Sequence, residues 1–389
     1  MEALRVDFES HGMFIEGHCY KLHVRSTLET GAHHLNLIFN WHDFPTATAD
    51  LPGTGGRIRT VQDDFEVTEE GAYSLSGSGD HVYLWIEKRG NTTKFVVDEL
   101  VKQLGMKFSE VGVAGLKDRH AVTRQWISVP RKYDSKLEGF KLEGTRILEV
   151  TAHSNKLGIG HLRGNRFRIR VRQSGPDSPA RAEAILQRLR VLGVPNYFGP
   201  QRFGNTGANA VRGAELVRDG RMRGPESIPI KRFLIAALQS LLFNHTLRLR
   251  LERGVYAGVL RGDVAKKHET GGIFVVEDAL IESPRAAALE ISATAPLYGR
   301  KVTPVAQFDG RALEDEVLAL AGLSWEGFKD RHGDRRITRI VMGEANFTAT
   351  DDGYWLEFSL PKGCFATTIL REVMKVDVDG LDDDSSGEG

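Results

Sequence analysis

The alternation of apolar and polar positions predicts β-strands over much of the first half of the chain. In His81–Glu87 every second residue is aliphatic and aromatic residues lie between, which is typical of a strand covered on both faces. In Arg166–Arg172 three apolar side chains alternate strictly with four arginines, which predicts a strand with one apolar and one basic face. Shorter strands are expected over 65–68, 111–113, 123–129 and 146–151.

Apolar residues spaced by three and four positions predict helices. The first covers Thr92–Leu104, the second runs from its N-cap Ser178 to Val191, and the third is a long amphipathic helix over Ile230–Glu252 that Gly254 can end. This mixture of strands and helices indicates an α+β protein.

The composition is that of an ordinary globular protein. The chain has 389 residues, 41% of them hydrophobic and 27% charged, and this length suggests two or three domains. The longest apolar run, Phe233–Phe243, is too short to span a membrane, and the N-terminus lacks the apolar region of a signal peptide. Two cysteines, Cys19 and Cys364, exclude a disulfide framework and a four-cysteine zinc site, so we expect a cytoplasmic protein.

The two ends of the chain differ from the rest. Residues 1–45 hold six of the thirteen histidines, but their spacing around Cys19 matches no standard zinc site, so we expect a loosely structured extension without a metal. Residues 377–389 hold six acids and no base, which is typical of a disordered tail. Without this tail the chain has 52 bases and 46 acids, so a site for a polyanion would have to be local.

Residues 112–125 have the residue types of a catalytic site. Small residues follow a predicted strand, and Asp118 then lies between Lys117 and Arg119. The adjacent cations favour the charged carboxylate, which can act as a nucleophile or a general base. An exposed hairpin of charged residues has the same pattern, so this segment alone leaves both interpretations open.

The segment from Lys156 to Arg172 holds six bases and no acid. Cations pair with phosphates, and a ring such as Phe167 can stack on an extruded base, so the segment suits RNA. A solvated sheet face explains the pattern equally well. The glycines from 158 to 164 lack the dinucleotide-binding spacing, and we expect no nucleotide cofactor.

Two further segments are informative only in combination with these. Residues 196–204 are rich in turn formers and contain three aromatic residues and Arg202. Residues 363–372 form a glycine-led turn into a helix that bears Arg371. Taken alone, residues 196–204 are explained equally well as a packed domain junction. Residues 363–372 alone indicate only the start of a helix.

Taken in this order, the four segments resemble the TruD family of tRNA pseudouridine synthases over residues 50–376. Matching stretches also lie at Asp64–Glu69, Asn91–Thr93 and Ser240–Asn244. The resemblance implies that Asp118 is the catalytic carboxylate and that Asn165, Phe167 and Phe365 line a uridine pocket. The alternation of its strand places Phe167 in the core instead, so two interpretations of this residue compete.

The remaining site residues are expected around this pocket. Arg59 stands where the family commonly has a lysine, and arginine and lysine are not interchangeable. We expect Arg59, Lys117 and Arg371 to bind the substrate. We expect the RNA backbone to be bound by Arg166, Arg168, Arg170, Lys156 and Arg202.

The resemblance also implies a fold and a reaction. The fold is a pseudouridine-synthase core with a mixed, largely antiparallel sheet flanked by helices, formed by 46–190 and 340–376 and interrupted by an inserted α/β domain over 191–339. The reaction is the isomerisation of uridine 13 of tRNA by a monomer after base flipping, without a cofactor or a metal. A non-catalytic tRNA-binding or chaperone protein on the same scaffold is the main alternative, and a hydrolase with an aspartate nucleophile is a third. Asp118 between two cations favours the synthase, because binding alone would not require it.

Overall fold

The computed structural model describes residues 13–15, 18–20, 34–219, 227–302 and 308–376. The predicted acidic tail over 377–389 lies outside these residues. Near the N-terminus, β1 (Met13–Ile15) pairs with β2 (His18–Tyr20). None of the described helices is both long and apolar enough to cross a bilayer.

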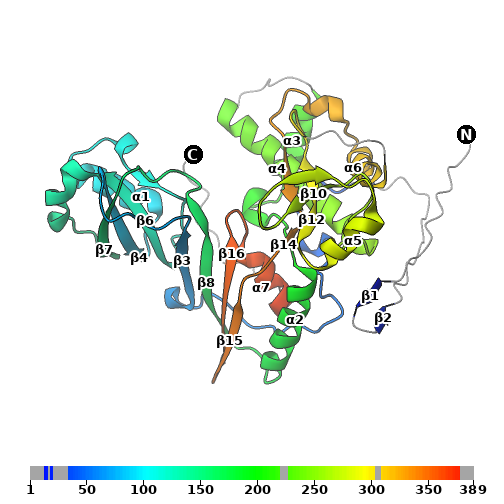
Figure 1. Ribbon diagram of the computed structural model, residues 1–389, viewed down its shortest axis with the longest axis horizontal. Helices are drawn as coiled ribbons and strands as arrows, with labels where there is room; N and C mark the ends of the chain where they lie inside the picture. Colours follow the sequence, from blue (N-terminus) through cyan, green and yellow to red (C-terminus); the bar gives the residue numbers. More distant parts are fainter. Residues whose placement is uncertain (1–12, 16–17, 21–33, 220–226, 303–307, 377–389) are drawn as a thin grey trace, which may run out of the picture.

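An eight-stranded mixed sheet forms one half of the molecule (Figure 1). Its strands are β3 (Phe65–Gly71), β4 (His81–Lys88), β5 (Gly112–Val113), β6 (Val122–Pro130), β7 (Thr145–His153), β8 (Leu162–Arg172), β15 (Ala345–Thr350) and β16 (Gly353–Pro361). They lie in the order β15-β16-β8-β3-β6-β4-β7, and β5 pairs with β6. The β3–β6 pair is parallel and the other pairs are antiparallel. The predicted α+β fold with a large mixed sheet is therefore confirmed.

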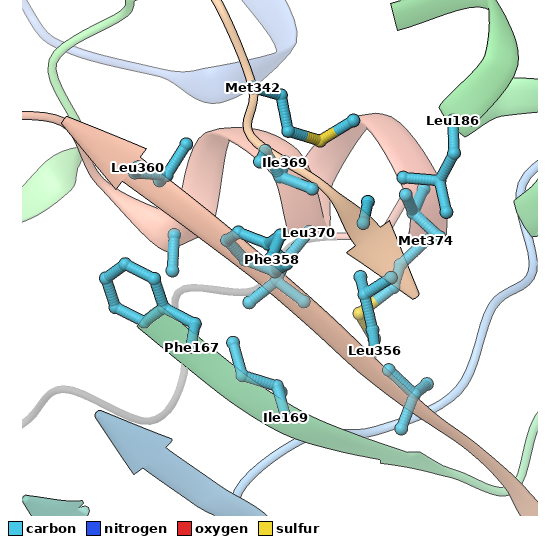
Figure 2. Packing of buried hydrophobic residues seen from close by; sticks show 14 of the residues in the cluster. Phe167, Ile169, Leu186, Met342, Leu356, Phe358, Leu360, Ile369, Leu370 and Met374 are labelled. Carbon is cyan, nitrogen blue, oxygen red and sulfur yellow. The ribbon is translucent and has the colours of Figure 1, made fainter. Parts of the chain in front are cut away.

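Helices cover one face of this sheet. They are α1 (Thr93–Leu104), α2 (Ser178–Leu192) and α7 (Ala366–Met374). The strand register places Thr123, Val67, Phe167 and Phe358 in one row, so their side chains share this face. One apolar cluster joins α1 to β4 and β6, and another joins α2 and α7 to β3, β8 and β16 (Figure 2). The boundary between the two clusters runs along β3 and β6.

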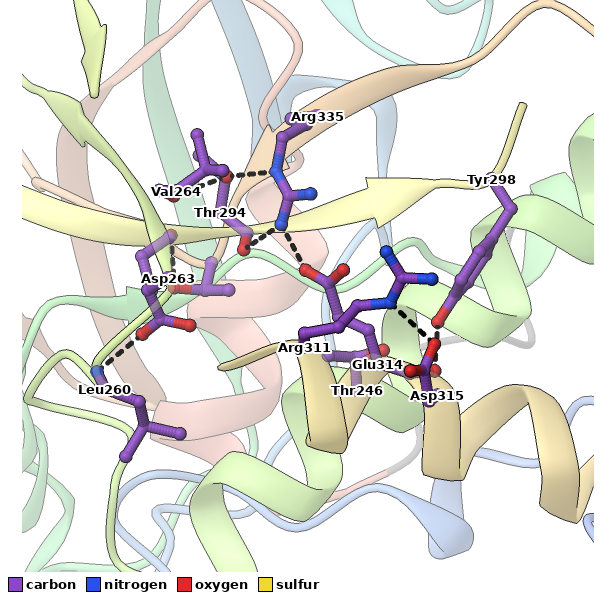
Figure 3. A network of polar contacts seen from close by, with 12 residues as sticks. Thr246, Leu260, Asp263, Val264, Thr294, Tyr298, Arg311, Glu314, Asp315 and Arg335 are labelled. Atoms are coloured by element: carbon purple, nitrogen blue, oxygen red, sulfur yellow. Dashed lines mark hydrogen bonds and ion pairs between the residues drawn. The ribbon is translucent and has the colours of Figure 1, made fainter. Parts of the chain in front are cut away.

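The chain leaves the large sheet after α2 and returns to it at β15. The residues between form a second unit from α3 (Asn209–Arg218), α4 (Ile228–Glu252), β10 (Val264–Lys267), β11 (Ile273–Val275), α5 (Ala279–Ala287), β12 (Ile291–Leu297), α6 (Asp309–Leu320) and β13 (Asp334–Ile337). Its antiparallel sheet has the order β11-β10-β12-β13. In its interior, Arg335 of β13 donates to Glu314 of α6 and to Thr294 of β12 (Figure 3). Burial raises the pKa of Glu314, and attraction to Arg335 opposes that rise.

The two crossings between the units lie side by side. Outward, the chain passes through β9 (Val194–Pro195), and on its return it passes through β14 (Arg339–Ile340). These short strands pair with each other in antiparallel orientation. Val194 and Ile340 are both buried in the apolar cluster under α2 and α7, so the crossing is packed rather than open.

The N-terminal segment 34–48 packs against the second unit. Trp41 and Phe44 are only 3% and 1% exposed, and both lie in the apolar cluster around α4. The backbone N–H of Leu35 also donates to the carbonyl of Leu320 at the end of α6. The expectation of a loose extension is therefore corrected for residues 34–45. Apolar side chains recur there at Leu35, Leu37, Phe39, Trp41 and Phe44, and burial of these side chains holds the segment in place.

The predicted helices differ from the structure in detail. Thr92 caps α1 rather than beginning it, since its hydroxyl accepts from the Phe95 N–H at 3.1 Å. The residue before α2 is Asp177 rather than Ser178, which is itself the first helical residue. Helix α4 begins at Ile228 and is buried on most sides rather than amphipathic, because α3, α6 and β12 pack around it.

Candidate active site

Asp118 lies on the loop between β5 and β6, at the helix-covered face of the large sheet. Its Oδ2 accepts from Nη2 of Arg59 at 2.9 Å, and its Oδ1 accepts from the backbone N–H of His120 at 3.0 Å. Each carboxylate oxygen therefore has a fixed donor. The side chain is still 31% exposed, so a ligand can reach it.

Arg59 is the nearest cation to this carboxylate, and its backbone is strained to place it there. Its φ is 55°, in the left-handed region that residues other than glycine rarely adopt. The guanidinium lies 4.3 Å above the ring of Phe65, at the start of β3. Burial lowers the pKa of Arg59, and attraction to Asp118 acts in the opposite direction. Phe65 lies in the stretch Asp64–Glu69, and the sequence predicts no role for it in the site.

The backbone of the Asp118 loop is held by buried side chains behind it. Nζ of Lys88 donates to the carbonyls of Asp118, Lys117 and Asn91 at 2.8, 3.2 and 2.7 Å. These three acceptors match the three N–H groups of an ammonium. The hydroxyl of Thr93 accepts from the Lys117 N–H at 2.9 Å. Lys88 is not among the site residues expected from the sequence, although it shares the parity of the buried aliphatic residues of β4.

A row of polar groups lies next to this loop on β3 and β8. Asn165 stands opposite Glu69 in the strand register. Oδ1 of Asn165 is buried and has no hydrogen-bond partner among the described residues. Nζ of Lys117 is ion-paired with Glu69 at 2.9 Å, and the two side chains are 5% and 1% exposed. Lys117 is therefore turned away from solvent. It forms part of the floor of the site and does not present an accessible cation to a substrate.

The structure favours the core interpretation of Phe167. Its ring is stacked on that of Phe358 at 5.4 Å and meets Phe65 edge-on at 6.5 Å. Only 7% of the residue is exposed, and its neighbours include Ile169 and Leu360 (Figure 2). Alternation along β8 had indicated this position correctly.

Phe365 is the more accessible ring. It is 40% exposed and stands at the N-cap of α7. Just before it, Nζ of Lys362 donates to the carbonyl of Gly160 at 3.0 Å, and the N–H of Gly160 donates to Ala114 at 2.8 Å. The turn before α7 is therefore linked to the loop that carries Asp118.

The expectation of a free basic face on β8 is corrected by the structure. On the face opposite the helices, charges of alternating sign lie on neighbouring strands from β7 to β16. In strand order they are Arg146, Glu87, Arg124, Glu66, Arg168 and Glu357. Neighbours in this charge ladder are ion-paired at N···O distances of at most 3.1 Å. Arg170 is likewise paired with Asp352 at 2.7 Å. Arg168 and Arg170 are thus neutralised by adjacent acids.

Other predicted cations lie at different places. Arg166 is 69% exposed, and the nearest acid contact is Glu70 at 3.8 Å. Nζ of Lys156 donates to the carbonyl of Ser109. Arg371 does not face the pocket; its guanidinium donates to the carbonyls of Trp41 and Phe44 because the N-terminal segment passes over α7.

Arg202 belongs to a pair of arginines at the junction of the two units. Arg202 and Arg336 lie 5.8 and 4.1 Å from the ring centre of Phe198. Arg336 also donates to the carbonyl of Gly363, in the turn before α7, at 3.1 Å. Within the described residues neither arginine has an acid as an ion-pair partner. Burial lowers the pKa of Arg336 to about 10, and repulsion from Arg202 adds to this effect. Arg336 is not among the residues expected from the sequence.

The arrangement can support carboxylate chemistry. Asp118 has two fixed donors and an accessible edge, so it can attack an electrophilic carbon or accept a proton. No three His, Cys, Asp or Glu side chains are gathered as metal ligands anywhere in the described ranges.

Comparison with known proteins gives a consistent result. The family model for tRNA pseudouridine synthase D (TruD) matches residues 43–222 and 227–373. A tRNA pseudouridine synthase D from Thermus thermophilus is 52% identical over 344 residues, which cover 88% of this chain and 95% of that protein. One from Anaeromyxobacter dehalogenans is 42% identical over 350 residues, with 88% and 99% covered. A solved structure assigned as TruD from Methanosarcina mazei has the same fold, with a TM-score of 0.70 at 23% identity over 90% of this chain and 99% of that one.

Proposed function

Because the chain belongs to the TruD family of tRNA pseudouridine synthases and is therefore an isomerase, we propose that it converts uridine 13 of tRNA to pseudouridine, with Asp118 as the catalytic carboxylate. One observation carries this assignment. The Asp118 carboxylate is oriented by Arg59 and by the His120 N–H, yet about a third of its side chain stays open to a ligand.

The division of the chain supports a split catalytic core. We assign residues 46–190 and 340–376 to this core and 191–339 to an inserted domain. The paired crossings at β9 and β14 lie at these boundaries.

The chemistry needs no redox partner. The C1′–N1 bond breaks, a C1′–C5 bond forms, the proton leaves C5 and N1 gains a proton, so atoms and electrons balance within the nucleoside. Asp118 would attack the sugar or the base, or remove a ribose proton.

Recognition of the base falls to Asn165. The uracil edge offers an N3–H donor between two carbonyl acceptors, and a side-chain amide presents one acceptor and two donors. Oδ1 of Asn165, which has no hydrogen-bond partner among the described residues, would accept from N3–H. A stacked uridine must first leave its helix, and the exposed ring of Phe365 would stack on it.

The assignment is tested with Asp118→Asn, which keeps the shape and removes the charge. Pseudouridine formation on an unmodified tRNA transcript should fall by roughly a thousandfold or more, whereas tRNA affinity should stay within about threefold. Asp134→Asn, at an exposed acid in the large-sheet half, is the matched control and should behave as the native protein. Substantial turnover by Asp118→Asn would refute the catalytic role, and no turnover by the native protein would favour the non-catalytic RNA-binding alternative.

A further inference from the structure

Three loops meet beside Asp118. The loop 114–118 is bonded to the loop 157–161 through the Gly160 N–H and the Ala114 carbonyl at 2.8 Å. The turn 361–365 is bonded to the same loop through Lys362 and the Gly160 carbonyl at 3.0 Å. These contacts fix the loops relative to one another at one end of the site.

Two of these loops expose aliphatic side chains to an unusual degree. Leu116 is 75% exposed and Ile159 is 76% exposed. Single exposed apolar residues are common on protein surfaces, but these two stand on adjoining, hydrogen-bonded loops, and Leu116 is two residues from Asp118.

Leu116 is held in this position by a fixed backbone. Its neighbours on both sides are bonded to buried groups, because Gln125 donates to the carbonyl of Gly115 at 3.2 Å and the Lys117 N–H donates to Thr93 at 2.9 Å. The Lys117 side chain points inward to Glu69. The loop therefore turns its lysine into the protein and its leucine outward.

The surroundings of this aliphatic tip are positively charged. Nζ of Lys362 donates to the Gly160 carbonyl at 3.0 Å, and Arg119, three residues after Leu116, is exposed. Lys156 is exposed as well and lies three residues before Ile159. Apolar tips surrounded by cations suit an RNA helix, in which charged backbones flank a stack of apolar base faces.

We propose that Leu116 and Ile159 form an apolar wedge that enters the RNA base stack and fills the space vacated by the target uridine when it turns toward Asp118. The proposal rests on the proposed function, because it requires that a base leave its helix. Inserted aliphatic side chains are known to hold base steps apart in other nucleic-acid complexes. The wedge stabilises the open helix while the uridine lies in the site.

The test measures unstacking separately from chemistry. An unmodified tRNA transcript carries 2-aminopurine beside the target uridine, and its fluorescence is recorded on binding to Asp118→Asn. Addition of Leu116→Ser and Ile159→Ser to this variant should lower the fluorescence rise at least about fivefold, while the Kd changes by less than about fivefold, since phosphate contacts supply most of the affinity. With Asp118 intact, the same two substitutions should lower kcat at least about tenfold.

Leu280→Ser provides the matched control, because Leu280 is 76% exposed on α5 of the second unit. It should leave the fluorescence, the Kd and kcat at native values. A native fluorescence rise and native kcat in the double variant would overturn the wedge, and would leave the tip as a surface for another protein. An equal loss in Leu280→Ser would overturn it also. Failure of the proposed function would appear differently, as full turnover by Asp118→Asn.

Discussion

At the scale of single residues, Lys88 couples the charge of the site to its geometry. Burial lowers the pKa of its ammonium to about 8; the Asp118 carboxylate opposes this shift and the neighbouring Lys117 adds to it. The protonated form fills three carbonyl acceptors, two of them on the Asp118 loop. Loss of the proton leaves one acceptor without a donor, so the loop should loosen.

Activity and stability should therefore respond to pH in opposite directions. We expect kcat to fall as pH rises through about 8. Between that pH and the ordinary lysine value near 10.4, the unfolded chain binds a proton that the folded chain lacks, so the contribution of Lys88 to the free energy of unfolding rises with pH. Lys88→Arg stays charged and should show a lower kcat without this alkaline fall. A fall of the same size in Lys88→Arg would assign it to another group.

Phe167→Leu separates the two roles considered for this ring. Leucine keeps most of the volume, so a core site should lose less than about 1.5 kcal/mol of unfolding free energy. Because Phe167 is packed on Phe358 and Phe65, we expect turnover per folded molecule to stay within about threefold of native. A tenfold loss of kcat at unchanged melting temperature would restore the stacking role.

At the scale of strands and helices, the charge ladder and the arginine pair should bind RNA differently. Arg168 already has two acidic partners, whereas Arg202 and Arg336 share the junction near α7 with no acid among the described residues in ion-pair contact. Arg202→Gln and Arg336→Gln should each lower the slope of log Kd against log salt by about one unit. Arg168→Gln should leave the slope unchanged, and a flatter slope in that variant would show that the ladder opens to bind phosphate.

The elements predicted most successfully are those whose pattern reflects burial. Strand β8 alternates because one of its faces packs under the helices, and β4 is apolar at successive positions because it is buried along most of its length. The partners of the β8 arginines could not be predicted, since they depend on the register of β3 and β16, which lie far away in the chain. Asp118 stood out by its charged neighbours, but the inward turn of Lys117 depends on Glu69, 48 residues away. The polar residues of α4 made the helix look amphipathic in the sequence. In the structure most of them are buried, because the folded chain supplies hydrogen-bond partners, such as the Tyr298 carbonyl for Gln239.

At the scale of the whole molecule, the segment 34–48 joins the two units. On one side Trp41 and Phe44 are buried against the second unit. On the other side Glu372 of α7 accepts from the N–H groups of Ala47 and Thr48 at 2.7 and 3.1 Å. Arg371 adds its bonds to the carbonyls of Trp41 and Phe44. Because both units contact the segment 34–48, we expect this segment to hold them in a fixed relative position. It should therefore fix the arginine pair relative to Asp118.

Two deletions distinguish this role from that of an inert extension. Removal of residues 1–33 leaves the contacts described above for the segment in place, so melting temperature and kcat should stay near native. Removal of residues 1–45 takes away two buried aromatic side chains, each worth about 3–5 kcal/mol in cores of this kind. Such a loss approaches the whole stability of an ordinary domain, so the shorter chain should unfold or melt at least about 10 °C lower.

Trp41→Ala in the full chain is the point-variant control and should reproduce part of that decrease, because the rest of the segment remains. If the 1–45 deletion instead melts as the native protein does, the segment lies on the surface of a junction that is stable without it, and only the β9–β14 crossing and the interface of α7 hold the two units together.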